Sequence, residues 1–285
     1  MHCEVSILIP TFNRGHLIER AIQTSINQSY KCKIIVCDHG STDNTKEICN
    51  RYLNEITYIR RENDYGIHFC ELEAILASET NFIHFCFDDD WMHHKYIEEC
   101  IKLMDKNTGV VYSNNIVLDI DSEDKIKDDW SNVNVINSEK LLSISKIPHV
   151  MKGLISPSCA LIRKKDAIKC LYNSTNLVSD KFYNGVGPDW LMTAMPLFRY
   201  KYCGYIKTPL IKFGLHNQSI TVDAITNNDE KKKKAFQEAY NGAKIYLLIS
   251  TITRILKFEL IYNLLANSFL LAFKVLRSII YKKKY

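Results

Sequence analysis

The stretch Asn81-Phe-Ile-His-Phe-Cys-Phe-Asp-Asp-Asp-Trp91 joins an apolar run to three consecutive aspartates. The apolar run predicts a buried strand, and the aspartates stand where that strand leaves the sheet. Three neighbouring carboxylates repel one another unless a cation lies between them. Hard divalent cations bind carboxylate oxygens together with the phosphates of a substrate. Taken alone, the triplet fits a solvated acidic turn equally well, so the rest of the chain has to decide between the two.

Short apolar runs alternate with amphipathic segments on both sides of this stretch. Besides 81–87, strands are expected at Val5–Ile9, Lys33–Cys37, Ile56–Ile59, Gly109–Tyr112 and 154–162. Helices are expected at 17–26, from near Asp43, over Glu71–Ser78 and from Asp189 to Met195. This alternation is typical of an α/β fold, an open sandwich of a mostly parallel sheet with helices on both faces.

Polar clusters follow three of the expected strands. They are Thr11–Arg14, Asp38–Asp43 and Asp88–Asp90. In open α/β sheets the ligand binds beyond the carboxyl ends of the strands, so the three clusters are expected to meet on one rim. Their convergence favours a binding site with a metal over a solvated turn.

Composition excludes several classes of protein. The chain has 285 residues, 46% of them hydrophobic, enough to bury a core of one large domain or two small ones. Its ten cysteines form no C-x-x-C pair and lie mostly in apolar runs, as in a reduced, cytoplasmic protein. Nothing at the N-terminus resembles a signal peptide. The first loop lacks the glycine patterns of dinucleotide-binding and P-loop enzymes.

The positive charge of the chain is concentrated at its C-terminal end. Residues 231–285 contain ten lysines and two arginines against Glu238 and Glu259, a net charge of +10, so the first 230 residues carry −5. The longest uncharged stretch, Leu260–Phe273, is too short to span the ~30 Å of a bilayer core. Amphipathic helices on an anionic membrane surface are expected, and no nucleic acid partner. Packing on the domain or on another subunit is the alternative.

Several stretches, in the right order, resemble the motifs of family 2 glycosyltransferases of the GT-A type. They are Val5–Arg14, Ser25–Tyr30, Ile34–Thr45, Phe85–Trp91, Pro188–Trp190 and His216–Thr221. The resemblance implies a GT-A domain over 1–225, with a nucleotide-sugar-binding half at 1–112 and an acceptor-binding half at 113–225. A basic amphipathic helical tail would follow at 226–285.

The family resemblance also implies an activity. A sugar would move with inversion from a nucleotide-diphosphate sugar, with UDP-sugars as the first expectation, to a hydroxyl of a saccharide or lipid-linked acceptor. Surface polysaccharide or glycolipid synthesis is the expected setting, at the cytoplasmic face of the membrane, and a homo-oligomer is left open.

Roles for individual residues follow from the same resemblance. The nucleotide-sugar would contact Pro10, Thr11, Phe12, Asn13, Arg14, Asp38, His39, Asp64 and Asp88. Mn²⁺ or Mg²⁺ would be held by Asp89, Asp90 and His216, and would stabilise the leaving diphosphate as a Lewis acid. Asp189 would take the acceptor proton as general base, although a carboxylate there also suits a helix N-cap.

Three positions depart from the family pattern. His39 stands where many members have a second acid, Gly66–Glu71 lacks an arginine found there in many members, and Phe87 precedes the aspartates in place of an acid. Two other functions therefore stay open. One is a nucleotidyltransferase on a similar sheet, and the other is a non-catalytic, membrane-associated protein that binds a nucleotide or sugar.

Overall fold

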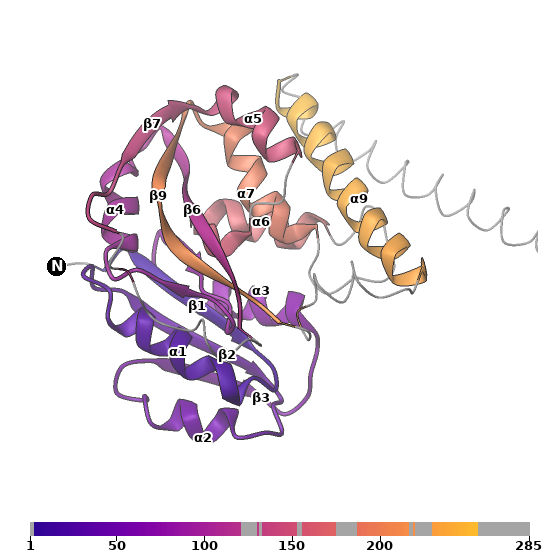
Figure 1. The fold of residues 1–285 in the computed structure, drawn as a ribbon. Helices are drawn as coiled ribbons and strands as arrows, with labels where there is room; N and C mark the ends of the chain where they lie inside the picture. Colours follow the sequence, from indigo (N-terminus) through magenta and orange to yellow (C-terminus); the bar gives the residue numbers. More distant parts are fainter. Residues whose placement is uncertain are drawn as a thin grey trace, which may run out of the picture.

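One mixed sheet runs through the middle of the protein (Figure 1). The computed structural model describes residues 3–120, 130, 133–152, 156–174, 187–216, 219 and 230–255. In these residues the sheet has nine strands in the order β3-β2-β1-β4-β8-β6-β9-β5, with β7 paired to β9.

The N-terminal half is built from parallel strands joined by helices. In chain order its elements are β1 (Val5–Thr11), α1 (Gly15–Ile26), β2 (Lys33–His39), α2 (Thr45–Asn50), β3 (Thr57–Arg61), α3 (Ile67–Ala77) and β4 (Phe82–Phe85). β1 lies between β2 and β4 and runs parallel to both. All seven residues of β1 are buried, as expected for a strand covered on both faces.

The C-terminal half contributes antiparallel and crossing strands. Its elements are β5 (Trp91–Met92), α4 (Tyr96–Leu103), β6 (Thr108–Asp119), β7 (Ser138–Leu142), α5 (Ser143–Lys152), a 3₁₀ turn (Pro157–Cys159), β8 (Ala160–Arg163), α6 (Lys164–Ser174), α7 (Pro188–Arg199), β9 (Tyr202–Leu215) and α9 (Glu230–Ile255). β8 is antiparallel to β4 and β6, whereas β9 is parallel to β6. The expected division between the two halves, after residue 112, falls inside β6.

Helices cover both faces of the sheet. Because successive strand residues point to opposite faces, Val5, Ile7 and Ile9 pack with α1, α2 and α4, while Leu8 packs with α3, α6 and α7. Each face therefore has its own apolar core. The expected α/β fold with helices on both faces is confirmed.

Several expected element bounds were wrong. The strand expected at 154–162 begins only at Ala160, because Pro157 starts a 3₁₀ turn in which the Ser156 hydroxyl accepts the Ser158 N–H. The strand expected to reach Phe87 ends at Phe85. β5, β7 and β9 were not expected at all.

The helix α9 packs on α7 and α6, two helices of the C-terminal half (Figure 1). Ala243, Tyr246 and Leu247 on its inner side belong to the same apolar core as α7. Gly187 lets α9 approach, since a Cβ there would lie 3.0 Å from the Ala239 carbonyl oxygen. Packing on the domain therefore describes this side of 230–255. The rest of the expected tail, 226–229 and 256–285, lies outside the described residues. Among the described helices, none combines the length and apolar character needed to cross a bilayer.

Candidate active site

The carboxyl ends of β1, β2 and β4 meet on one rim. The Thr11 hydroxyl at the end of β1 donates to Asp88 Oδ2 at 2.7 Å, just beyond β4. Thr11 is also the register partner of Asp38 in β2. The side chains that follow three separate strands are thus brought together, as the strand order requires.

Hydrogen bonds join the loop after β1 to the loop after β2. Asn13 adopts a left-handed conformation, with φ of 53°, which asparagine tolerates better than most residues. Its side-chain oxygen accepts the Thr42 N–H at 2.7 Å, and its own N–H donates to the Ser41 hydroxyl at 2.8 Å. Phe12, one residue earlier, is 43% exposed. The loop is held rigid while an aromatic ring beside it remains accessible.

Asp38 is fully buried and already has protein partners. Its Oδ1 accepts the Ser41 N–H at 2.9 Å, and its Oδ2 accepts the Tyr58 hydroxyl at 2.6 Å. Arg60 Nε lies 3.5 Å from the same Oδ2 and balances the charge. Asp38 therefore fixes the loop after β2, and its expected contact with the nucleotide stays a prediction.

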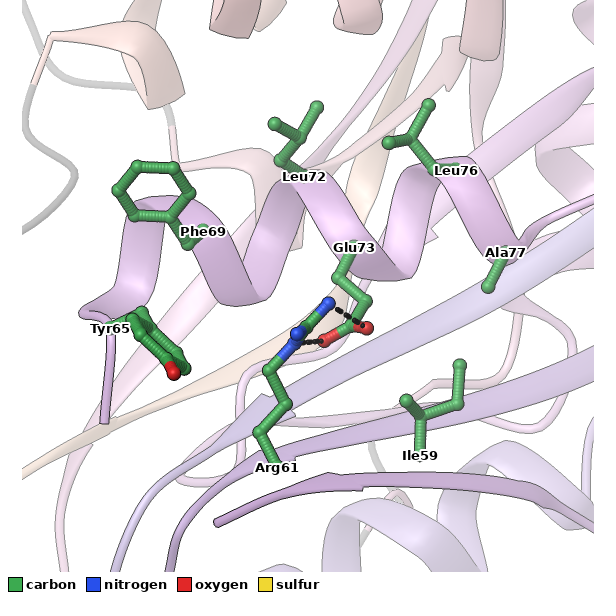
Figure 2. Close-up of a pocket in the computed structure, with 8 residues that line it drawn as sticks. All are labelled: Ile59, Arg61, Tyr65, Phe69, Leu72, Glu73, Leu76 and Ala77. Carbon is green, nitrogen blue, oxygen red and sulfur yellow. Dashed lines mark hydrogen bonds and ion pairs between the residues drawn. The ribbon is translucent and has the colours of Figure 1, made fainter. Parts of the chain in front are cut away.

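His39 connects the rim to a groove along α3. Its ring is buried, and Nε2 lies 3.3 Å from Glu73 Oε2, while Arg61 donates twice to Glu73 at 2.7 Å. Figure 2 shows this Arg61–Glu73 pair between β3 and α3, with Tyr65 beside it. The groove has a volume of about 420 Å³. His39 Nδ1 is buried without a hydrogen-bond partner among the described residues.

Asp64 lies at the entrance to α3. Its Oδ1 accepts the Gly66 N–H at 2.7 Å, which closes the turn before the helix. The residue is exposed. The structure thus gives it a local turn-forming role, and its expected nucleotide contact is untested.

The aspartate triplet divides into three environments. Asp88 accepts a hydrogen bond from the Thr11 hydroxyl. Asp89 Oδ2 lies 3.3 Å from Nε2 of His216, the residue that follows β9. Asp90 is 1% exposed, and its Oδ1 accepts the Gly214 N–H at 3.1 Å. A Cβ on Gly214 would lie 2.1 Å from the Asp89 carbonyl oxygen, so only glycine lets β9 come this close.

Burial and mutual repulsion shift the acidity of the triplet. Burial and the neighbouring Asp89 raise the pKa of Asp88 to about 7, against the opposing effects of the Thr11 hydroxyl and Arg14. The same two causes raise the pKa of Asp90 well above its ordinary value. A bound cation would relieve this repulsion.

The donor set at Asp89 and His216 fits a divalent cation. Carboxylate oxygen and imidazole nitrogen are both ligands of Mn²⁺, and the carboxylate suits Mg²⁺. Within the described part of the chain no group of three or more His, Cys, Asp or Glu side chains forms a ready metal cluster. Asp90 serves the contact with Gly214, and its expected role as a ligand stays a prediction.

Asp189 occupies the first turn of α7. Its Oδ1 accepts the N–H groups of Gly187 at 2.8 Å and Trp190 at 2.6 Å, so the side chain satisfies free donors of the helix start. Burial raises the pKa of Asp189 to about 6, although these two hydrogen bonds oppose the rise. A carboxylate with this pKa can take a proton at neutral pH.

Comparison with known families accounts for this arrangement. Residues 6–171 match the model of Glycosyl transferase family 2, more than half of the chain. The chain belongs to glycosyl transferase family 2. The expected family is thereby confirmed.

Curated family 2 relatives share part of their length with this chain. A chondroitin synthase from Pasteurella multocida is 31% identical over 116 residues, 39% of this chain and 12% of the relative. The Escherichia coli enzyme named UDP-Glc:alpha-D-GlcNAc-diphosphoundecaprenol beta-1,3-glucosyltransferase WfgD is 27% identical over 113 residues, 39% of this chain and 45% of the relative. The chain thus spans less than half the length of these relatives.

Solved structures share the fold of this chain. Staphylococcus aureus TarS 1-349 in complex with UDP superposes with a TM-score of 0.56 at 15% identity, over 90% of this chain and 72% of that chain. The mannosyltransferase PcManGT from Pyrobaculum calidifontis, in complex with GDP-Man and Mn²⁺, gives 0.50 at 15% identity, over 96% and 87%. These likenesses support the GT-A architecture.

Glu71 is a candidate functional residue that the sequence analysis did not identify. It lies on α3, at the end of the stretch Gly66–Glu71, and it is 1% exposed. Burial, and then the nearby Asp189 carboxylate, raise its pKa well above the ordinary value, and Oε2 has no hydrogen-bond partner among the described residues. One signal was present in the sequence: Glu71, Ala74, Ile75 and Ser78 recur at helical spacing on one face, which predicts a buried carboxyl.

Proposed function

We propose that this chain transfers a sugar from a nucleotide-diphosphate sugar to an acceptor hydroxyl, with inversion at the anomeric carbon. The observation that carries the proposal is the meeting of Asp89 and His216, 127 positions apart in sequence, at 3.3 Å on the rim that holds Asp88. The close approach of β9 at Gly214 places the His216 imidazole beside Asp89, and a solvated acidic turn would not require such an approach.

The donor would lie along the rim formed by β1, β2 and β4. Phe12 offers an exposed ring for the base, and His39 Nδ1 offers a buried donor or acceptor. A uridine diphosphate sugar is the proposed donor, supported by the UDP complex of TarS and by the UDP-Glc relative. Asp88 would bind the ribose.

The diphosphate would be neutralised at Asp89 and His216. These two side chains would hold Mn²⁺ or Mg²⁺, which, when bound, supplies positive charge to the leaving diphosphate. The Mn²⁺ in the PcManGT complex supports this assignment. Arg14 lies close enough to lower the pKa of Asp88 and adds positive charge to the same rim.

Asp189 would act as the general base. As the acceptor hydroxyl attacks the anomeric carbon, the carboxylate takes its proton while the bond to the diphosphate oxygen breaks, a contribution of roughly 10²–10⁴ in rate. One displacement of this kind inverts the anomeric centre. The acceptor would be a saccharide or a lipid-linked saccharide, as in the synthesis of surface polysaccharide or glycolipid, and the WfgD relative supports it.

The experiment is release of nucleoside diphosphate from a panel of nucleotide sugars, with and without Mn²⁺. We expect release from a UDP-sugar that requires the metal. Asp189→Asn should bind the donor and fail to transfer. Absence of both turnover and metal-dependent binding for every donor would contradict the proposal.

A binding protein without catalysis is the second candidate. His39 and the lack of an arginine in Gly66–Glu71 favour it, because both depart from the family pattern beside the rim. This candidate predicts donor binding that is the same in wild type and Asp189→Asn, with no release of nucleoside diphosphate from either.

A further inference from the structure

A second pocket lies between β6, α5, the 3₁₀ turn and β9, and it shares no lining residue with the groove along α3. It has a volume of about 140 Å³. Its polar lining includes Ser113, Asn114, Asn115, Ser156, Lys146 and His149. The lining residues in the described part of the chain include a lysine and a histidine but no carboxylate, so the pocket is suited to an anion.

The cationic group of this pocket is held in place by its neighbours. Lys146 Nζ lies 3.5 Å from the centroid of the Tyr205 ring, a cation–π contact. The Tyr205 hydroxyl donates to Asn114 Oδ1 at 2.7 Å, and Asn114 Nδ2 donates to the Lys207 carbonyl at 2.8 Å. A chain of contacts from β6 to β9 thus positions the ammonium group before any ligand arrives.

The pocket is joined to the proposed transfer site on two sides. Trp190 follows Asp189 and donates through its indole Nε1 to the carbonyl of Val150, the residue after His149, at 3.3 Å. The opposite wall, the turn Pro157–Cys159, packs against α7 and against β4, the strand that leads into the aspartates. The walls of the pocket are therefore in contact with the helix that carries Asp189 and with the strand that precedes the aspartates.

We propose that this pocket binds an acidic group of the sugar acceptor, a phosphate or a carboxylate, through Lys146 and His149. The inference rests on the proposed function, because it assigns the second substrate of the same site. An anion is the ligand that a fixed ammonium group among amide and hydroxyl donors recognises. A phosphate next to the sugar would mark a lipid-linked acceptor, and a carboxylate would mark an acidic polysaccharide.

The test measures binding of three probes to the full-length protein by titration calorimetry, in the presence of UDP and Mn²⁺. The probes are glucose 1-phosphate, glucuronate and the neutral methyl glucoside. We expect one or both anions to bind at least about tenfold more tightly than methyl glucoside. The stronger of the two identifies the source of the acidic group.

Matched variants assign the effect to the pocket. Lys146→Met and His149→Gln should each lose most of the preference for the anion, while Lys146→Arg keeps it. Lys169→Met removes the same charge from an exposed position on α6 and should behave as wild type. Equal binding of anionic and neutral probes, no binding of either anion, or no effect of Lys146→Met in a folded protein would overturn the proposal. Failure of UDP to bind, with anion binding intact, would instead count against the proposed function alone.

Discussion

At the scale of single residues, the acidity of Asp189 has a measurable consequence. Its pKa is raised to about 6, so the carboxyl is protonated below that pH and cannot accept the acceptor proton. We expect the rate of transfer at saturating donor and metal to fall about tenfold for each pH unit below about 6, and to level off above it. The measurement is the pH profile of kcat. A profile that stays flat down to about pH 4 would contradict the role of Asp189 as base.

Glu71 makes a prediction about stability. Its pKa is raised well above the ordinary value by burial and by Asp189, so the folded state binds this proton more tightly than the unfolded state. Stability linked to this group is therefore present at low pH and is lost as pH rises. We expect Glu71→Gln, which cannot ionise, to gain stability relative to wild type between about pH 5 and 8. Urea unfolding at both pH values measures the difference, and an unchanged difference would show that Glu71 is not titrating in the folded protein.

At the scale of elements, the position of β9 requires a residue without a side chain at position 214. Gly214→Ala would place a methyl group 2.1 Å from the Asp89 carbonyl oxygen, so β9 or the aspartate turn has to shift. We expect a loss of about 1–3 kcal/mol in the free energy of unfolding, and weaker metal-dependent UDP binding because His216 moves with β9.

Gly66→Ala is a suitable control for this variant. Gly66 has a φ of 85°, and nothing lies within 4 Å of its missing Cβ, so the change introduces backbone strain without a clash. It should cost about 1–3 kcal/mol, a destabilisation similar to that of Gly214→Ala, and leave metal-dependent binding intact. Equal effects of the two variants on metal-dependent binding would show that the approach of β9 does not position the metal ligands.

The helix α9 has an outer side whose apolar residues are exposed. Ile245, Leu248 and Ile252 are 48%, 60% and 45% exposed, at spacings that place them on one face. We propose that this face and the lysines around it lie on an anionic membrane surface at the cytoplasmic side. Ile245→Glu with Leu248→Glu should lower flotation with vesicles that contain phosphatidylglycerol by about tenfold.

The packing of α9 decides how that experiment is designed. Removing the helix would uncover Tyr246 and Leu247, which are buried against the domain, so the experiment uses point substitutions on the outer side and keeps the helix. Leu53→Glu, at a 54% exposed leucine outside α9, is the control. Equal flotation of the α9 variant and the control would remove the membrane assignment.

At the scale of the whole molecule, sequence patterns predicted the parallel half better than the mixed half. Buried parallel strands such as β1 are continuous apolar runs, which the sequence displays directly. The sequence did not predict β9, because Lys207 and Lys212 interrupt its apolar residues. Pro209 also lies where the register of its pairing with β6 shifts. A strand of this kind is specified by its partners and not by its own pattern.

The site was predictable to the extent that it follows from strand order. The rim shared by Thr11 and Asp88 required only parallel strands with polar residues after them. The pairing of Asp89 with His216 depends on the path of β9, a property of the tertiary structure for which neighbouring sequence carries little information. The helical spacing of Glu71 indicates a buried face of α3, but which elements cover that face, α6 and the sheet, is again set by the tertiary structure.

The contact between Gly187 and Ala239 joins the start of α7, which carries Asp189, to the helix α9. α9 touches the start of α7 with its inner side, and its outer side is open. A helix has a diameter of about 10 Å. If its outer side rests on a membrane, α9 acts as a spacer that sets the height of the transfer centre, and an acceptor anchored in lipid has to reach at least that far before its hydroxyl meets Asp189.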